Sequence, residues 1–172
     1  AALEAGGVAA DLGCGTGIAL ITLAKAFPRS RFHGYDISEL ALGRARADAA
    51  AAGLANLAFH NARTQPLPGD GSFDLITTFD CVHDMTHPQE VVRAIRAALK
   101  PDGVWFIADI DGGATFEENL LTNPRAGVMY AVSVLACMSS GRSEPGGAGL
   151  GTLGLPEPKM RALAEGGGFT RF

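Results

Sequence analysis

The residues best suited to chemistry lie near the start of the chain, in the stretch DLGCGTG from Asp11 to Gly17. An apolar run at 8–12 predicts a buried strand before this stretch, and the apolar residues of 18–26 predict a helix after it. Glycine at such a junction permits positive φ and leaves no Cβ in the path of a ligand. The N–H groups at the start of the helix favour negatively charged or electron-rich atoms. The stretch therefore predicts a turn that binds a ligand.

A second acidic residue follows at a suitable distance. The strand predicted at 31–35 ends in Asp36, about 20 residues after the glycines, where a carboxylate can accept hydrogen bonds from both hydroxyls of a ribose. Glycines at a strand–helix junction can also serve packing alone, but two nucleoside-binding features in register favour the binding site. In the dinucleotide fingerprint the third glycine follows three residues after the second, whereas Gly17 follows Gly15 by two. The spacing therefore disfavours an NAD site.

Strands and helices alternate through the first two thirds of the chain. Strands are predicted at 8–12, 31–35, 57–60, 73–79 and 104–108, and helices at 18–26, at 38–52 and between the capping-box pair Thr86 and Gln89 and Pro101. This order predicts an α/β fold with a doubly wound, mostly parallel sheet. Ligands of such sheets bind beyond the carboxyl ends of the strands, where the turn, Asp36, Asn61 and residues 79–83 would meet.

The pattern changes after the fifth predicted strand. Residues 116–121 and 127–138 predict two helices, 141–154 a glycine-rich loop, 156–166 a last helix and 169–172 the start of a strand. We expect a single domain over 1–172, with a cofactor-binding core at 1–112, a helical and loop insertion that covers the acceptor at 113–155, and a C-terminal part at 156–172. The chain lacks an initiator methionine and begins almost directly in a strand, so we expect it to be a piece of a longer protein.

Composition narrows the class of protein. The 172 residues are 47% hydrophobic, enough for a substantial core, and the net charge of −4 disfavours a nucleic-acid-binding surface. Neither a leader nor an apolar run long enough for a bilayer is recognisable. The three cysteines, Cys14, Cys81 and Cys137, are widely spaced without a CxxC pair, which indicates neither disulfides nor a metal site. We expect a cytoplasmic protein without nucleic-acid or membrane partners, and a homodimer stays open.

Four segments together resemble a known family. DLGCGTG, YDIS, LPGDGSFD and LKPDGVWFI stand in the order of the motifs of class I S-adenosylmethionine-dependent methyltransferases. FDCVHDMTHP and the closing GGGFTRF are similar to bacterial members that carry an N-terminal winged-helix segment, which is absent here. The resemblance implies a Rossmann-like sheet whose last strand this chain lacks. It also implies S-adenosylmethionine as the cofactor and S-adenosylhomocysteine as its product.

The resemblance also implies a role for each part of the site. The turn would lie under the methionine end of the cofactor, Asp36 would bind the ribose, and Ile37 would cover the adenine. Asn61 stands where many members have an aspartate, and its amide oxygen can still accept a bond from the adenine amino group, with a plain turn residue as the alternative. The cofactor-binding residues implied in full are Asp11, Gly13, Cys14, Gly15, Gly17, Asp36, Ile37, Asn61, Ala62, Phe79 and Asp80.

Methyl transfer itself needs mainly positioning, and a base is optional. His83, just past the fourth predicted strand, is the candidate base, with a histidine that merely bonds a backbone carbonyl as an equal alternative. We expect a small-molecule acceptor that is apolar or aromatic. Phe116, Met129, Tyr130 and Met138 would line its pocket or form a core face. The alternative function is a sensor that binds S-adenosylmethionine without turnover and is attached to a DNA-binding segment.

Overall fold

The computed structural model describes residues 2–172. These residues form two compact units, one made of residues 2–79 with Ala94–Ile107 and the other of Asp80–Arg93 with Ala108–Phe172. The chain therefore passes from the first unit to the second and back before it completes the second. No helix in the described range is both long and apolar enough to span a membrane.

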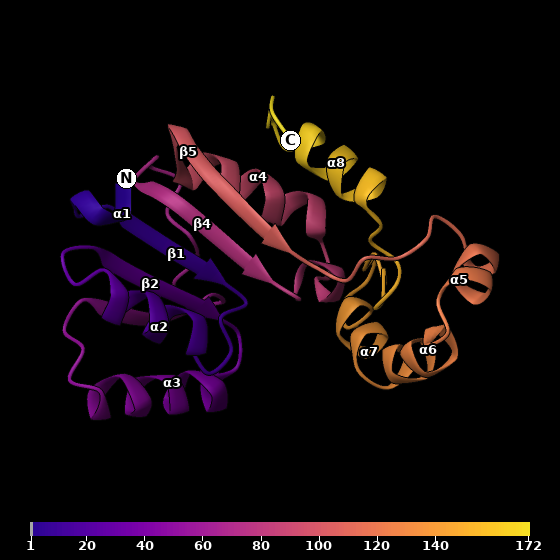
Figure 1. Cartoon of the computed structure of the whole chain (residues 1–172), viewed down its shortest axis with the longest axis horizontal. Coiled ribbons are helices and arrows are strands. Elements are labelled where there is room, and N and C mark those ends of the chain that lie inside the picture. The colour runs from indigo at the N-terminus through magenta and orange to yellow at the C-terminus, as the bar shows by residue number, and fades with distance from the viewer. Residues whose placement is uncertain (1) are drawn as a thin grey trace. The chain divides into compact units, whose positions relative to one another are not determined.

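The first unit is built on a five-stranded sheet with the order β3-β2-β1-β4-β5. The strands are β1 (Val8–Leu12), β2 (Arg31–Asp36), β3 (Leu57–Asn61), β4 (Phe73–Phe79) and β5 (Leu99–Ala108). β1 pairs in parallel with β2 and with β4, β2 pairs in parallel with β3, and the β5 arrow runs the same way as that of β4 (Figure 1). The order reverses at β1, which makes the carboxyl ends of β1 and β4 the switch point where ligands bind. The prediction of a doubly wound, mostly parallel sheet is confirmed.

Helices α1 (Ala2–Ala5), α2 (Ile18–Ala26) and α3 (Glu39–Ala51) complete this unit, together with the end of α4 (Pro88–Ala98). Ser38 caps α3 as predicted, because its hydroxyl accepts a hydrogen bond from the N–H of Ala41 at 3.3 Å. The core joins side chains from α2, α3 and the strands, with Ala9, Leu20, Phe32, Leu42, Ala45 and Phe59 among its buried members. This packing holds the carboxyl ends of β1, β2 and β3 in fixed register.

The fifth strand begins earlier than predicted, at Leu99 in place of Val104, and α4 ends at Ala98. The Nζ atom of Lys100 lies 2.6 Å from Oδ1 of Asp74, and Leu99 is buried. These contacts hold the first residues of β5 against the sheet. The periodicity of apolar residues in the sequence does not indicate them.

The capping box expected at the start of α4 is not formed. The Thr86 hydroxyl lies 3.4 Å from the Ser143 hydroxyl, and Nε2 of Gln89 donates to the Leu163 carbonyl at 3.1 Å. The first turn of the helix is closed by the carbonyl of His87, which accepts from the N–H of Glu90. Both side chains of the expected box are therefore occupied by tertiary contacts within the second unit.

The second unit contains the short 3₁₀ helix η1 (Val82–Asp84) and the helices α5 (Phe116–Thr122), α6 (Ala126–Leu135), α7 (Cys137–Gly141) and α8 (Glu157–Gly166). The single helix predicted over 127–138 is wrong, because a turn at Ala136, where φ is −118° and ψ is −75°, separates α6 from α7. The predicted loop between α7 and α8 is confirmed, although Thr152, Leu153 and Leu155 within it are buried.

The strand predicted at 169–172 is also wrong, since these residues carry no strand. The N–H of Phe169 donates to the Ala164 carbonyl at 3.0 Å, which returns the chain to the end of α8. The Arg161 guanidinium then lies 4.5 Å from the centre of the Phe172 ring. Contacts with the preceding helix thus take the place of strand pairing.

Candidate functional site

The glycine turn after β1 combines one glycine needed for packing with one that exposes bare backbone. Gly15 and Gly17 have φ of +53° and +75°. A Cβ on Gly17 would lie 2.6 Å from Cζ of Phe59, whereas a Cβ on Gly15 would meet no atom within 4 Å. Gly17 therefore fits the turn to the core, and Gly15 leaves open space that a ligand can fill.

The N–H groups of this turn are already engaged. Those of Gly13 and Cys14 donate to the Tyr35 carbonyl at 2.8 and 3.1 Å, and that of Gly17 donates to the Cys14 carbonyl at 2.9 Å. The N–H of Gly15 donates to Oδ2 of Asp36 at 2.8 Å. Neighbouring acceptors thus occupy these four N–H groups. The expectation that the N–H groups at the start of α2 favour negatively charged or electron-rich atoms stays a prediction.

Asp36 links the turn to the start of α3. Its Oδ2 accepts from Gly15 and its Oδ1 accepts from the N–H of Ser38, both at 2.8 Å. Each carboxylate oxygen has two lone pairs, so each retains room for one further donor. Asp36 therefore presents a fixed, charged acceptor pair at the carboxyl end of β2.

Asp11 adds a second carboxylate beside the turn. It is 3% exposed, and the Thr77 hydroxyl donates to its Oδ1 at 2.7 Å. Burial raises the pKa of Asp11 to about 6, the Thr77 hydrogen bond partly offsets this rise, and the negative charge of Asp36 adds to it. Two carboxylates beside the turn create a negative potential that suits a positively charged ligand.

The Cys14 side chain turns away from this surface. Its thiol is buried, and a Cβ on Gly34 would lie 2.9 Å from its Sγ atom. Burial, followed by the charges of Asp11 and Asp36, raises the pKa of this thiol to about 12. Cys14 is therefore an unreactive thiol, and any contact it makes with a ligand runs through its backbone.

The remaining residues predicted to bind a nucleoside follow β2 and β3. Ile37 is 55% exposed, which is unusual for a large apolar side chain and leaves its surface available. Nδ2 of Asn61 donates to Oε1 of Glu39 at 2.6 Å, and its Oδ1 accepts from the N–H of Arg63 at 2.9 Å. One lone pair of that oxygen remains, while the N–H of Ala62 donates to the Asp36 carbonyl. Asn61 thus shapes a turn and keeps one acceptor position.

The two residues at the end of β4 belong to different units. Phe79 belongs to the first unit, where the centre of its ring lies 5.9 Å from that of Phe106. Asp80 is the first residue of the second unit and has φ of +51°, a conformation that non-glycine residues rarely adopt. Its N–H donates to the Ala108 carbonyl at 2.7 Å. Their contacts with a cofactor stay predictions.

His83 lies in η1 and is 3% exposed. Its Nδ1 lies 2.5 Å from Oδ1 of Asp109, and its Nε2 lies 3.4 Å from Oδ1 of Asp84. Burial lowers the pKa of His83, but the hydrogen bond and charge of Asp109, with the charges of Asp84 and Asp80, outweigh burial and place the pKa above its usual value. The hydrogen-bond partner of His83 is thus the Asp109 carboxylate. The alternative, a histidine that bonds only a backbone carbonyl, is wrong. The general-base role stays a prediction.

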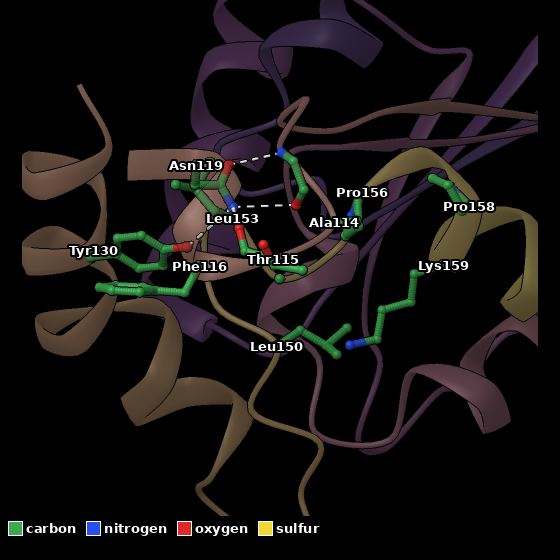
Figure 2. Close-up of a pocket in the computed structure, with 12 residues that line it drawn as sticks. Ala114, Thr115, Phe116, Asn119, Tyr130, Leu150, Leu153, Pro156, Pro158 and Lys159 are labelled. Carbon is green, nitrogen blue, oxygen red and sulfur yellow. Dashed lines mark hydrogen bonds between the residues drawn. The ribbon is translucent and has the colours of Figure 1, made fainter. Parts of the chain in front are cut away.

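A cavity of about 370 Å³ lies in the second unit (Figure 2). Phe116 and Tyr130 line one side, with ring centres 5.0 Å apart, and Leu150 and Leu153 add aliphatic surface. Nδ2 of the buried Asn119 donates to the carbonyl of Thr115 at 2.9 Å and holds that wall in place. Two of the four residues expected at a pocket are therefore found there, whereas Met129 and Met138 are not among its lining residues.

Several residues that shape the site carry no signal by themselves in the sequence. Thr77 reaches Asp11 because β1 and β4 pair with Asp11 opposite Thr77. Glu39 holds the Asn61 amide across 22 positions of sequence. Thr77 could have been found only by predicting that β1 pairs with β4 and by aligning the residues of the two strands.

Comparisons with known proteins agree with this geometry. A family model described as a methyltransferase domain matches residues 3–141. The ubiquinone biosynthesis O-methyltransferase of Neisseria meningitidis is 32% identical over 106 residues, which are 59% of this chain and 43% of that protein. The chain thus spans less than half the length of this curated relative.

Solved structures show the same fold. The YcgJ protein of Bacillus subtilis has a TM-score of 0.65 and 22% identity over 95% of this chain and 62% of its own. A SAM dependent methyltransferase from Aquifex aeolicus has a TM-score of 0.57 and 23% identity over 61% of this chain and 57% of its own. The family model, the sheet order and the site at its switch point agree, and the chain belongs to the class I S-adenosylmethionine-dependent methyltransferases.

Proposed function

We propose that this domain holds S-adenosylmethionine at the carboxyl ends of β1, β2 and β3 and transfers its methyl group to a small acceptor with an apolar or aromatic body. The observation that carries the proposal is the pair of carboxylates, Asp11 and Asp36, beside a turn in which the N–H groups of Gly13, Cys14, Gly15 and Gly17 already donate within the chain. S-adenosylmethionine is cationic at its sulfonium and ammonium groups, so the pair attracts it. The anionic pyrophosphate of NAD would be repelled at the same place.

The residues present fit this cofactor. Gly15 provides space that a Cβ would otherwise take, the free lone pairs of Asp36 can accept the ribose hydroxyls, and the exposed side chain of Ile37 can cover the adenine. Asn61 keeps one acceptor position for the adenine amino group. When bound, the cofactor supplies an electrophilic methyl group on a good leaving group. Positioning of the acceptor by the chain could then supply roughly 7–11 kcal/mol of the barrier.

The acceptor site we propose is the cavity beside Phe116 and Tyr130. Its volume of about 370 Å³ lies in the range of pockets for small molecules. Its walls combine the rings of Phe116 and Tyr130 and aliphatic surface with polar groups, and Lys159 provides one positive charge among the lining residues. The relative in Neisseria meningitidis is named as an O-methyltransferase, which favours a hydroxyl as the group that is methylated.

The test begins with calorimetric titration of S-adenosylmethionine, S-adenosylhomocysteine and NAD into the full chain. We expect micromolar binding of the first two and none of NAD. Turnover of hydroxylated aromatic acceptors is then measured with the full-length protein, which separates methyl transfer from a sensor that binds without turnover. Binding of NAD in preference to S-adenosylmethionine would overturn the proposal.

Removal of the Asp36 carboxylate is expected to weaken cofactor binding. Asp36→Ala loses charge-assisted hydrogen bonds worth about 1.5–3 kcal/mol, so the Kd for S-adenosylmethionine should rise roughly 10- to 150-fold. Calorimetry measures the Kd, and circular dichroism checks that the variant is folded. Asp48→Ala is the matched control, because Asp48 pairs with Arg44 on the exposed face of α3. An unchanged Kd in folded Asp36→Ala would exclude the ribose contact.

Truncation of the Tyr130 side chain is expected to weaken binding of the acceptor and to leave binding of the cofactor unchanged. Tyr130→Ala removes a ring from the cavity wall and should raise the acceptor KM about tenfold while the cofactor Kd stays unchanged. Leu121→Ala is the control, because Leu121 is 87% exposed and does not line the cavity. Equal KM values for Tyr130→Ala and the wild-type protein would place the acceptor elsewhere.

A further inference from the structure

Three side chains of the second unit bring together the donor types of a transition-metal site. His83 and Asp84 lie on η1, and Cys137 begins α7. One ligand atom from each lies within 4.8 Å of the other two. We propose that these three residues bind a divalent transition-metal ion of the zinc type.

The separations support ligands that share one ion. Two nitrogen or oxygen ligands at the usual zinc distances, around a tetrahedral ion, lie about 3.3 Å apart, and a sulfur ligand lies about 3.6 Å from either. Nε2 of His83 lies 3.4 Å from Oδ1 of Asp84, which agrees with this spacing. Cys137 lies within reach after a shift of about 1 Å at most.

The other nitrogen of His83 has a different role. Its separation of 2.5 Å from Oδ1 of Asp109 is a hydrogen-bond distance and is too short for two ligands of one ion. Nδ1 therefore donates to Asp109, which leaves the lone pair of Nε2 directed at the metal position. A carboxylate behind a metal-binding histidine is a common arrangement that fixes the tautomer and raises the basicity of the ligand. In the second group of possible ligands, Asp80, His83 and Asp109, the close pair of His83 and Asp109 is thereby explained as a hydrogen bond.

Two buried oxygens near His83 need a positive partner. Oδ1 of Asp84 is shielded from solvent and accepts no hydrogen bond, and the same holds for Oδ2 of Asp109, whose side chain is 7% exposed. A buried carboxylate oxygen without a donor is costly, and a cation beside Asp84 removes that cost.

The donor set selects the kind of ion. A thiolate and an imidazole favour zinc and its neighbours, whereas magnesium and calcium prefer oxygen ligands alone. The Cys137 thiol releases its proton to solvent when the sulfur binds the ion, so the net reaction exchanges one proton for one metal–sulfur bond. Sγ of Cys137 lies 3.1 Å from the Thr152 hydroxyl, which can hold the thiolate by donating to it. The ion would tie η1 to α7 within the second unit.

Cobalt(II) is the probe, because its absorption spectrum reports both the thiolate and the geometry. The full chain, treated with a chelator and reduced, is titrated with Co²⁺ and then with Zn²⁺. We expect about one equivalent to bind, with a thiolate-to-cobalt charge-transfer band, intense tetrahedral d–d bands, and loss of both spectra on addition of Zn²⁺.

Variants assign the ligands. Cys137→Ser should abolish the charge-transfer band, and Asp84→Asn, a nearly isosteric change at a partly exposed side chain, should raise the Kd for Co²⁺ at least tenfold. His87→Gln and Cys81→Ser are controls outside the site and should bind as the wild-type chain does. Absence of binding at about 100 μM Co²⁺ would overturn the proposal and leave His83 as a hydrogen-bond partner of Asp109 alone. Binding that survives both ligand variants in folded protein would overturn it equally.

Discussion

Alanine at Gly15 is expected to leave the domain folded and to weaken cofactor binding, whereas alanine at Gly17 is expected to cause the larger loss in the free energy of unfolding. The two glycines share a turn and a positive φ, but they differ in what a Cβ would meet. At Gly17 the new atom would lie 2.6 Å from Cζ of Phe59, so overpacking and backbone strain together should cost about 2–5 kcal/mol. At Gly15 only the backbone strain remains, about 1–2 kcal/mol.

For cofactor binding, the larger effect is expected at Gly15 and the smaller one at Gly17. A Cβ on Gly15 projects into the space proposed for the cofactor, so the Kd for S-adenosylmethionine should rise roughly 10- to 100-fold. Urea denaturation measures the free energy of unfolding and calorimetry measures the Kd of each variant. Wild-type affinity in Gly15→Ala would mean that the ligand does not approach this part of the turn.

Asp11→Asn is expected to produce a more stable domain that binds its cofactor less well. The native pKa of Asp11 is about 6 against a usual value of 3.8, so the native state binds this proton more tightly than the unfolded state. Between these two values a rise in pH therefore lowers the stability of the wild-type protein, by about 3 kcal/mol in total, and above pH 6 this loss is complete. The neutral amide avoids the loss, while its oxygen can still accept from the Thr77 hydroxyl.

The measurement is urea denaturation of both proteins at several values of pH. The variant should gain about 3 kcal/mol at pH 7.5, and the gain should vanish near pH 3.5. Asp74→Asn is the control of opposite sign, because the hydrogen bond from Lys100 lowers the pKa of Asp74 and its loss should destabilise the domain at neutral pH. A variant of Asp11 with no gain at pH 7.5 would show that the carboxyl is not penalised by burial. An unchanged cofactor Kd would remove Asp11 from the binding site.

Local sequence signals predicted the elements of the first unit closely. The bounds of β1, α2 and β4 agree with the apolar runs, and Ser38 caps α3, because these features depend on residues near one another in the chain. The positions of the glycine turn and Asp36 followed from the same spacing. Strand order at the switch point then brought them together, as the alternation of elements predicted.

Features that depend on distant contacts could not be predicted in this way. The turn N–H groups look available in sequence, but the Tyr35 carbonyl and Asp36 accept from them only once β1 and β2 are paired. The sequence indicated no metal site because Cys137 is far along the chain from His83 and Asp84, and only the fold places the three together.

The two backbone hydrogen bonds to Asp36 have a kinetic consequence. Because the N–H groups of Gly15 and Ser38 fix both carboxylate oxygens, the side chain loses its rotamer freedom during folding and has little left to lose when a ribose arrives. Association should then proceed without a slow rearrangement of this loop, and differences in affinity among nucleoside ligands should appear in their dissociation rates. The lifetime of the bound product, S-adenosylhomocysteine, would accordingly set an upper limit on the frequency of turnover.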